Sequence, residues 1–158
     1  SSLIDRVIVD GASPQPIKGY RKIIAIVYLI SFLKNTKFVA NLLTKMMKED
    51  GAPVQDVQHF VADFQSAERR SFRRAMSQAN LLRLNLQFDN PAFFVSGGKE
   101  AETIHDWHRR LADKNARSEC AYYPGKGHAW LFSDVDTHIQ LLGYFFQDAA
   151  FPEKLKRF

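Results

Sequence analysis

The sequence lacks several features that would have assigned it to a particular class of protein. It contains a single cysteine, Cys120, so no internal disulfide can form. Its longest apolar stretch, Ile23 to Leu33, is about eleven residues, whereas roughly twenty are needed to cross a bilayer. The first residues show no signal-peptide pattern. These absences favour a cytoplasmic protein with no membrane span.

The basic residues are concentrated in a few places, and the net charge is +5. A surface that binds nucleic acid needs basic side chains interleaved with exposed aromatic ones. In the main basic run, Glu68 comes first and Phe72 falls at a phase that a helix would bury. We therefore expect a solvated helix face and no nucleic-acid partner. The run comprises Arg69, Arg70, Arg73 and Arg74, and a smaller basic group lies in the tail at Lys154, Lys156 and Arg157.

The overall composition is that of a globular domain. Hydrophobic residues make up 46% of the 158 residues and charged residues 25%, which excludes disorder across the whole chain. Thirteen phenylalanines are present. Aromatic side chains supply much of the buried area of any fold, so we expect most of these to fill a core, although they could also line a large apolar pocket.

Three short apolar runs predict β-strands, at residues 6–10, 92–95 and 119–123. Residues 20–87, between the first two runs, show no β alternation. Their apolar residues recur instead at helical spacing, with a break at 49–53 where Gly51 suits a helix end.

Two further helices are predicted at residues 102–115 and 135–146. The apolar side of the last one would comprise Ile139, Leu142, Phe145 and Phe146. Strands that alternate with helices indicate an α/β fold of about three parallel strands with right-handed crossovers. The first strand would then have an apolar edge for a partner to cover, either a missing N-terminal half of the protein or a second copy of the chain.

Proton-transferring side chains follow two of the predicted strands. Gly97-Gly98-Lys99-Glu100 comes after the second strand, and Pro124-Gly125-Lys126-Gly127-His128 comes after the third. The carboxyl ends of parallel strands are where α/β proteins build their sites. An acid and a histidine at this edge would be two of the three members of a catalytic triad, provided that the two side chains touch.

The order of these segments resembles the C-terminal portion of an α/β-hydrolase. In that family a nucleophile elbow comes first, and the acid and the histidine follow. The resemblance implies a partial hydrolase core at residues 1–13 and 89–158, with a helical cap or lid at 14–88. The chain contains no Gly-x-Ser-x-Gly elbow, so the resemblance places the nucleophile outside this chain and implies that the chain alone is inactive.

The resemblance also implies roles for two residues. His128 would be the general base, and Glu100 would orient it within a Ser-His-Glu triad that hydrolyses a carboxylic ester or a related acyl compound. The Phe, Met and Ile residues of the cap suggest, by analogy, a small apolar substrate. No cofactor is implied, because the serine mechanism needs no metal. The alternative is a non-catalytic binding or assembly module on a hydrolase-like scaffold.

Each candidate residue also has a structural interpretation. His128 could be an ordinary loop histidine, and Glu100 a carboxylate that favours the start of a helix. Asp10, at the end of the first strand, could be a rival acid, but it suits a structural role with turn amides better. Trp130 could pack beneath the histidine loop or form a pocket wall.

Other chemically capable residues are weaker candidates. Ser13 and Ser96 lie near strand ends but outside any elbow, so neither is expected to be the nucleophile. His105 and His108 have a spacing that zinc ligands can use, but no third ligand is evident nearby. We expect these two histidines at the surface.

Overall fold

The computed structural model describes residues 5–16, 18–49, 51–83 and 88–158. The chain divides into two compact units, one formed by Ser1–Ser13 with Asn85–Phe158 and the other by Pro14–Leu84. Residues 84–87, where the predicted cap would rejoin the predicted core, lie outside the described residues. The assignment of the units as hydrolase core and cap remains a prediction.

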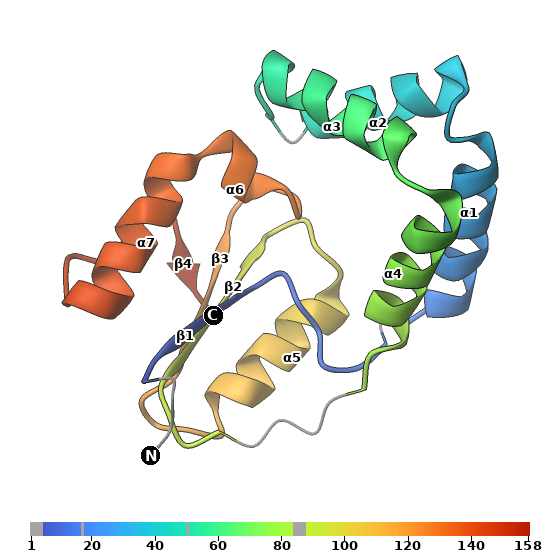
Figure 1. The fold of residues 1–158 in the computed structure, drawn as a ribbon. Helices are drawn as coiled ribbons and strands as arrows, with labels where there is room; N and C mark the ends of the chain where they lie inside the picture. Colours follow the sequence, from blue (N-terminus) through green and yellow to red (C-terminus); the bar gives the residue numbers. More distant parts are fainter. Residues whose placement is uncertain (1–4, 17, 50, 84–87) are drawn as a thin grey trace. The chain divides into compact units, whose positions relative to one another are not determined.

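The first unit contains a four-stranded sheet in the order β1-β2-β3-β4 (Figure 1). β1 to β3 are parallel, and β4 pairs antiparallel with β3. The α/β class and the three parallel strands are as predicted. β4 escaped prediction because two residues are too few to show an alternating pattern. The strands are β1 (Val7–Asp10), β2 (Ala92–Gly97), β3 (Glu119–Tyr123) and β4 (Lys156–Arg157).

The central strand β2 is buried along its whole length. Successive side chains of a strand point to opposite faces, so β2 supplies two cores. Phe93 and Val95 belong to one cluster with residues of α6 and α7, whereas Phe94 packs with residues of α5 on the other face. Figure 1 shows α5 on one side of the sheet and α6 and α7 on the other. The three helices are α5 (Glu102–Ala112), α6 (Trp130–Ser133) and α7 (Val135–Gln147).

The predicted apolar side of the last helix is only partly right. Leu141 and Phe145 of α7 are buried against the sheet, whereas Ile139 is 57% exposed and Phe146 is 47% exposed. Leu142 is also exposed. Two series of apolar residues with helical spacing run along this helix, and the sequence alone cannot choose between them. Packing against Phe93 selects the Leu141–Phe145 series.

The second unit is all helical, as predicted. α1 packs against α4, and α2 packs against α3. α2 ends at Glu49, where the break was predicted, and Gly51 beyond it has a left-handed φ of 85°. Asp50 lies outside the described residues. No helix in the described ranges is long and apolar enough to span a membrane. The helices are α1 (Tyr20–Leu33), α2 (Lys37–Glu49), α3 (Val54–Ser66) and α4 (Arg69–Leu81).

The arginines of α4 lie on a largely solvated face, and two of them stack on aromatic rings. The guanidinium of Arg69 lies 5.8 Å from the ring centroid of Phe32, and that of Arg73 lies 5.2 Å from the ring centroid of Tyr28. Both rings belong to α1 and are themselves exposed. Sequence patterning within one helix could not reveal these partners. The absence of a nucleic-acid partner remains a prediction.

Candidate active site

Backbone hydrogen bonds join the acid loop (residues 97–100) to the histidine loop (residues 124–128) at the carboxyl edge of the sheet. The Gly98 amide donates to the Tyr123 carbonyl at 2.8 Å, and the Lys99 amide donates to the Lys126 carbonyl at 2.9 Å. A Cβ at position 97 would lie only 2.1 Å from the Gly127 carbonyl oxygen, so only glycine permits this approach. The acid loop and the histidine loop are therefore held in direct backbone contact.

The contact between the two loops places Glu100 next to His128. The Nδ1 atom of His128 lies 3.0 Å from Oε2 of Glu100. The Glu100 side chain is 4% exposed and the His128 side chain 74% exposed. The Gly97 amide donates to the other carboxylate oxygen, Oε1, at 2.9 Å. The prediction that the acid and the imidazole touch is confirmed.

The environment of Glu100 favours its ionised form. Burial opposes ionisation, but the hydrogen bonds from His128 and Gly97 outweigh it and lower the pKa of Glu100. An ionised carboxylate can only accept hydrogen bonds, so Nδ1 of His128 carries the proton that it receives. The neutral ring is thereby held as the Nδ1–H tautomer, in which Nε2 is the basic nitrogen.

Asp10 lies at the end of β1 and is a structural neighbour of this pair. The indole Nε1 of Trp130 donates to Oδ1 of Asp10 at 3.1 Å. Trp130 is fully buried in the core cluster, so it packs beneath the histidine loop, one of the two positions expected from the sequence. The partner of Asp10 here is an indole N–H rather than the expected turn amides, and the hydrogen bond from Nδ1 of His128 goes to Glu100.

Asp10 should make stability depend on pH. Burial raises the pKa of Asp10 from 3.8 to about 6, and the Glu100 charge also raises it, whereas the Trp130 hydrogen bond and the charge of His128 lower it. Between these values the folded chain binds more protons at Asp10 than the unfolded chain, so the stability contributed by Asp10 falls as the pH rises. The shift corresponds to at most about 3 kcal/mol.

The test compares the wild type with Asp10→Asn, in which the amide oxygen can still accept from Trp130. We expect the free energy of unfolding of the wild type, relative to that of the variant, to fall by up to about 3 kcal/mol between pH 4 and pH 7. Urea unfolding at a series of pH values measures this difference, from which the titrations of groups that do not interact with Asp10 cancel. A difference that does not change with pH would contradict the prediction.

The expectation that His105 and His108 lie at the surface is wrong. Both are buried, because they lie on the side of α5 that packs against the sheet. His105 Nε2 donates to the Gly97 carbonyl at 3.1 Å, and His108 Nε2 donates to the Ala12 carbonyl at 3.1 Å. Burial lowers the pKa of His108 to about 4, so this ring is neutral. The two rings satisfy carbonyl groups of the loops at the site edge.

Among the described residues, no group of three or more His, Cys, Asp or Glu side chains is placed to hold a metal ion. Ser96 is fully buried within β2, where no substrate could meet it. Ser13 lies in an irregular segment after β1, and no helix follows it directly. Neither serine therefore has the strand-turn-helix setting of a nucleophile elbow.

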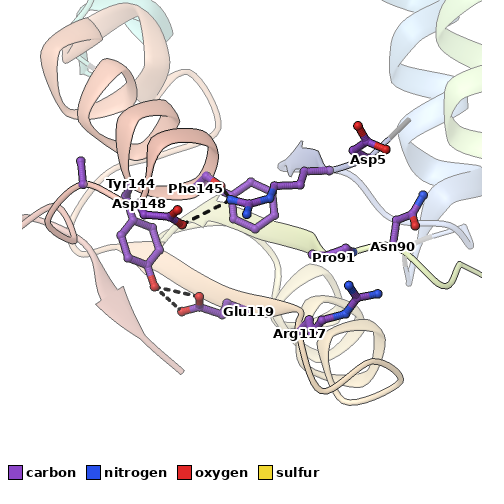
Figure 2. Close-up of a pocket in the computed structure, with 10 residues that line it drawn as sticks. Asp5, Asn90, Pro91, Arg117, Glu119, Tyr144, Phe145 and Asp148 are labelled. Carbon is purple, nitrogen blue, oxygen red and sulfur yellow. Dashed lines mark hydrogen bonds and ion pairs between the residues drawn. The ribbon is translucent and has the colours of Figure 1, made fainter. Parts of the chain in front are cut away.

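A hollow of the first unit lies elsewhere. It has a volume of about 560 Å³ and opens beside the amino ends of the strands (Figure 2). Glu100 and His128 follow the carboxyl ends of β2 and β3, at the opposite edge. Two pairs of its polar groups contact each other: Tyr144 donates to Glu119 at 2.7 Å, and Arg6 lies 3.5 Å from Asp148. Sites in α/β sheets form at the carboxyl edge, so this hollow is not the candidate active site.

The fold is a partial α/β-hydrolase fold, with a mostly parallel sheet, helices on both faces, and an acid loop and a histidine loop at the carboxyl edge. The chain is similar to the structure of MenH from S. aureus, with a TM-score of 0.67 and 13% identity over 92% of this chain and 59% of that one. It is also similar to the structure of Rv0554 from Mycobacterium tuberculosis, with a TM-score of 0.61 and 13% identity over 94% of this chain and 58% of that one.

The chain thus spans 58–59% of the length of these two proteins. No protein-family model matches the sequence, and no curated protein is found similar to it. At 13% identity, the structural similarity establishes the fold and not the activity.

Proposed function

We propose that this chain is the C-terminal portion of a serine hydrolase that acts on carboxylic esters or related acyl compounds. Glu100 and His128 would be two members of its triad, and the nucleophilic serine would lie outside this chain. The observation that carries the proposal is the 3.0 Å contact between a buried carboxylate and an exposed imidazole at the carboxyl edge of a parallel sheet.

The chemistry follows from the tautomer that Glu100 selects. Nε2 of His128 takes the proton from the serine hydroxyl as the hydroxyl oxygen attacks the acyl carbon. The imidazolium then returns this proton to the leaving alcohol, which leaves an acyl-serine for water to hydrolyse by the same route. Glu100 stabilises the imidazolium in both steps, and it stays ionised because its pKa is lowered.

The rest of the protein would supply the serine and the amide groups that stabilise the oxyanion. It would also cover the open edge of β1, where Val7 is exposed, and the exposed apolar residues Ile139 and Phe146 of α7. A strand preceding this chain suits that edge, since the two similar structures are substantially longer than this chain. A second copy of the chain is the alternative partner.

The helical unit supports an apolar acyl group as the substrate. It exposes large apolar side chains on each of the helices α1 to α4, including Phe32, Phe38 and Phe60. In an α/β-hydrolase, a helical insertion at this point of the chain would shape the substrate pocket. The proposal therefore favours small apolar esters over charged ones.

The chain alone is expected to be inert, because it lacks the nucleophile. We expect no turnover of short-chain p-nitrophenyl esters and no covalent labelling by a biotinylated fluorophosphonate. The longer protein encoded by the upstream reading frame should react at a serine that precedes residue 1. His128→Ala should abolish that labelling, because the serine would lose its base.

His59→Ala is the matched control, since His59 is an exposed histidine on α3 of the helical unit. This variant should label like the wild type. Ester turnover by the 158-residue chain that His128→Ala abolishes would contradict the placement of the serine outside the chain. An upstream reading frame without an elbow serine would instead favour the binding or assembly module.

A further inference from the structure

Gly11 lies directly against the Glu100–His128 pair. It follows the last residue of β1, and its φ of +54° is left-handed. A Cβ at this position would lie 2.6 Å from Nδ1 and 2.7 Å from Cε1 of His128, and 3.1 Å from Oε1 of Glu100. Real Cβ atoms essentially never approach other atoms to within 3.0 Å, so the space that a side chain would need is already filled by the imidazole.

The backbone at Gly11 cannot easily retreat from the ring. The Gly11 amide donates to the Val95 carbonyl of β2 at 2.8 Å. The preceding residue, Asp10, is paired in register with Val95 and is held by the indole of Trp130. The first anchor, Val95, belongs to β2, the strand that leads to Glu100, and the second, Trp130, belongs to α6.

We propose that Gly11 is a positioning residue for His128, an inference that rests on the proposed function. The absence of a side chain lets the imidazole lie against the β1 backbone, where its Nδ1 meets Glu100. β1 is thus part of the acid–histidine constellation, although it contributes no functional side chain to it.

The consequence of adding a Cβ follows from which group can move. Glu100 is buried and bonded to the Gly97 amide, so it is fixed. The His128 side chain is 74% exposed and can turn toward solvent. Gly11→Ala should therefore break the contact between His128 and Glu100 while the sheet stays folded.

The tautomer of His128 reports this contact without any need for a nucleophile. The experiment is ¹⁵N NMR of the histidine-labelled 158-residue chain above the pH at which imidazole titrates, with the His128 signals assigned from His128→Gln. In the wild type we expect mostly the Nδ1–H tautomer, because Glu100 accepts that proton. In Gly11→Ala we expect Nε2–H to become the major form, as it is for a neutral imidazole without a partner in water, and as Glu100→Gln should also show.

Gly125→Ala is the matched control. Gly125 also has a left-handed φ, +73°, and it lies in the histidine loop, but a Cβ there would have nothing within 4 Å. This variant imposes the same backbone strain without the collision, so it should keep the wild-type tautomer. Gly11→Asn serves as a second variant, because Asn tolerates left-handed backbone better than Ala and still carries the Cβ.

The outcomes are distinguishable. A wild-type ring without excess Nδ1–H would contradict the acid–histidine pair and, with it, the proposed function. A normal wild type with an unchanged tautomer in Gly11→Ala would overturn the role of Gly11 alone. So would an equal change in Gly125→Ala, or the unfolding of both Gly11 variants while Gly125→Ala folds.

Discussion

Glu100→Gln is expected to lower kcat of the proposed longer protein, which would contain the serine, by about four orders of magnitude, as the loss of the acid does in other triads. The variant keeps the size of the side chain, and its amide oxygen can still accept from Gly97. Its NH₂ group would then face Nδ1 of His128, now 3.0 Å from the carboxylate. A donor at that place favours the Nε2–H tautomer, which cannot take a proton from serine.

The measurement is the steady-state hydrolysis of p-nitrophenyl esters by the longer protein. Glu102→Gln is the control, because Glu102 is an acid two residues away that lies on the surface and pairs with Arg109 at 2.7 Å. It should keep wild-type activity. Should Glu100→Gln retain activity within about tenfold of the wild type, Glu100 would not be the acid of the triad.

Phe93→Ala is expected to destabilise the chain by about 3–5 kcal/mol. Phe93, the second residue of β2, is 0% exposed, and it joins the core cluster that contains Trp130, Leu141 and Phe145. Its ring also makes edge contacts with Phe145 and Tyr144, at centroid distances of 5.7 and 6.0 Å. Removing it leaves a cavity that sheet and helix are too rigid to close.

Urea unfolding followed by tryptophan fluorescence measures this loss, since Trp130 belongs to the same cluster. Phe132→Ala is the control, because Phe132 is 54% exposed on α6, and we expect a change of about 0.5 kcal/mol or less. Equal losses in the two variants would show that Phe93 does not lie in the core of the folded chain.

Much of the fold could be predicted because most of its elements, unlike the two-residue β4, are long enough to show their own periodicity. The strand at 119–123 and the helical stretch that begins at Tyr20 show it within a few residues. The incorrect predictions for α5 and α7 concern which side of a helix is buried. Ile139 and Leu141 both lie on apolar series of α7, and His105 is polar and yet buried, because only the packed neighbour decides which side of a helix faces inward.

The residues of the candidate site were likewise predictable only in part. Glu100 and His128 could be found from the sequence, because each follows a strand and a glycine-containing loop, and the carboxyl ends of parallel strands meet at one edge. Gly11 could not be assigned to the site from the sequence. Its importance depends on the ring of His128, a residue more than a hundred positions away. The local sequence around Gly11 cannot show that this distant ring occupies the place of a side chain.

The sequence by itself determined the order of strands and helices, the two loops, and the acid and histidine that they present, since these depend on local periodicity and turn chemistry. Only the tertiary structure decided which helix faces are buried, that Trp130 binds Asp10, and that the imidazole rests on Gly11 against Glu100. The physical reason is that burial and contact are properties of surfaces from distant segments, and these surfaces come together only when the sheet forms.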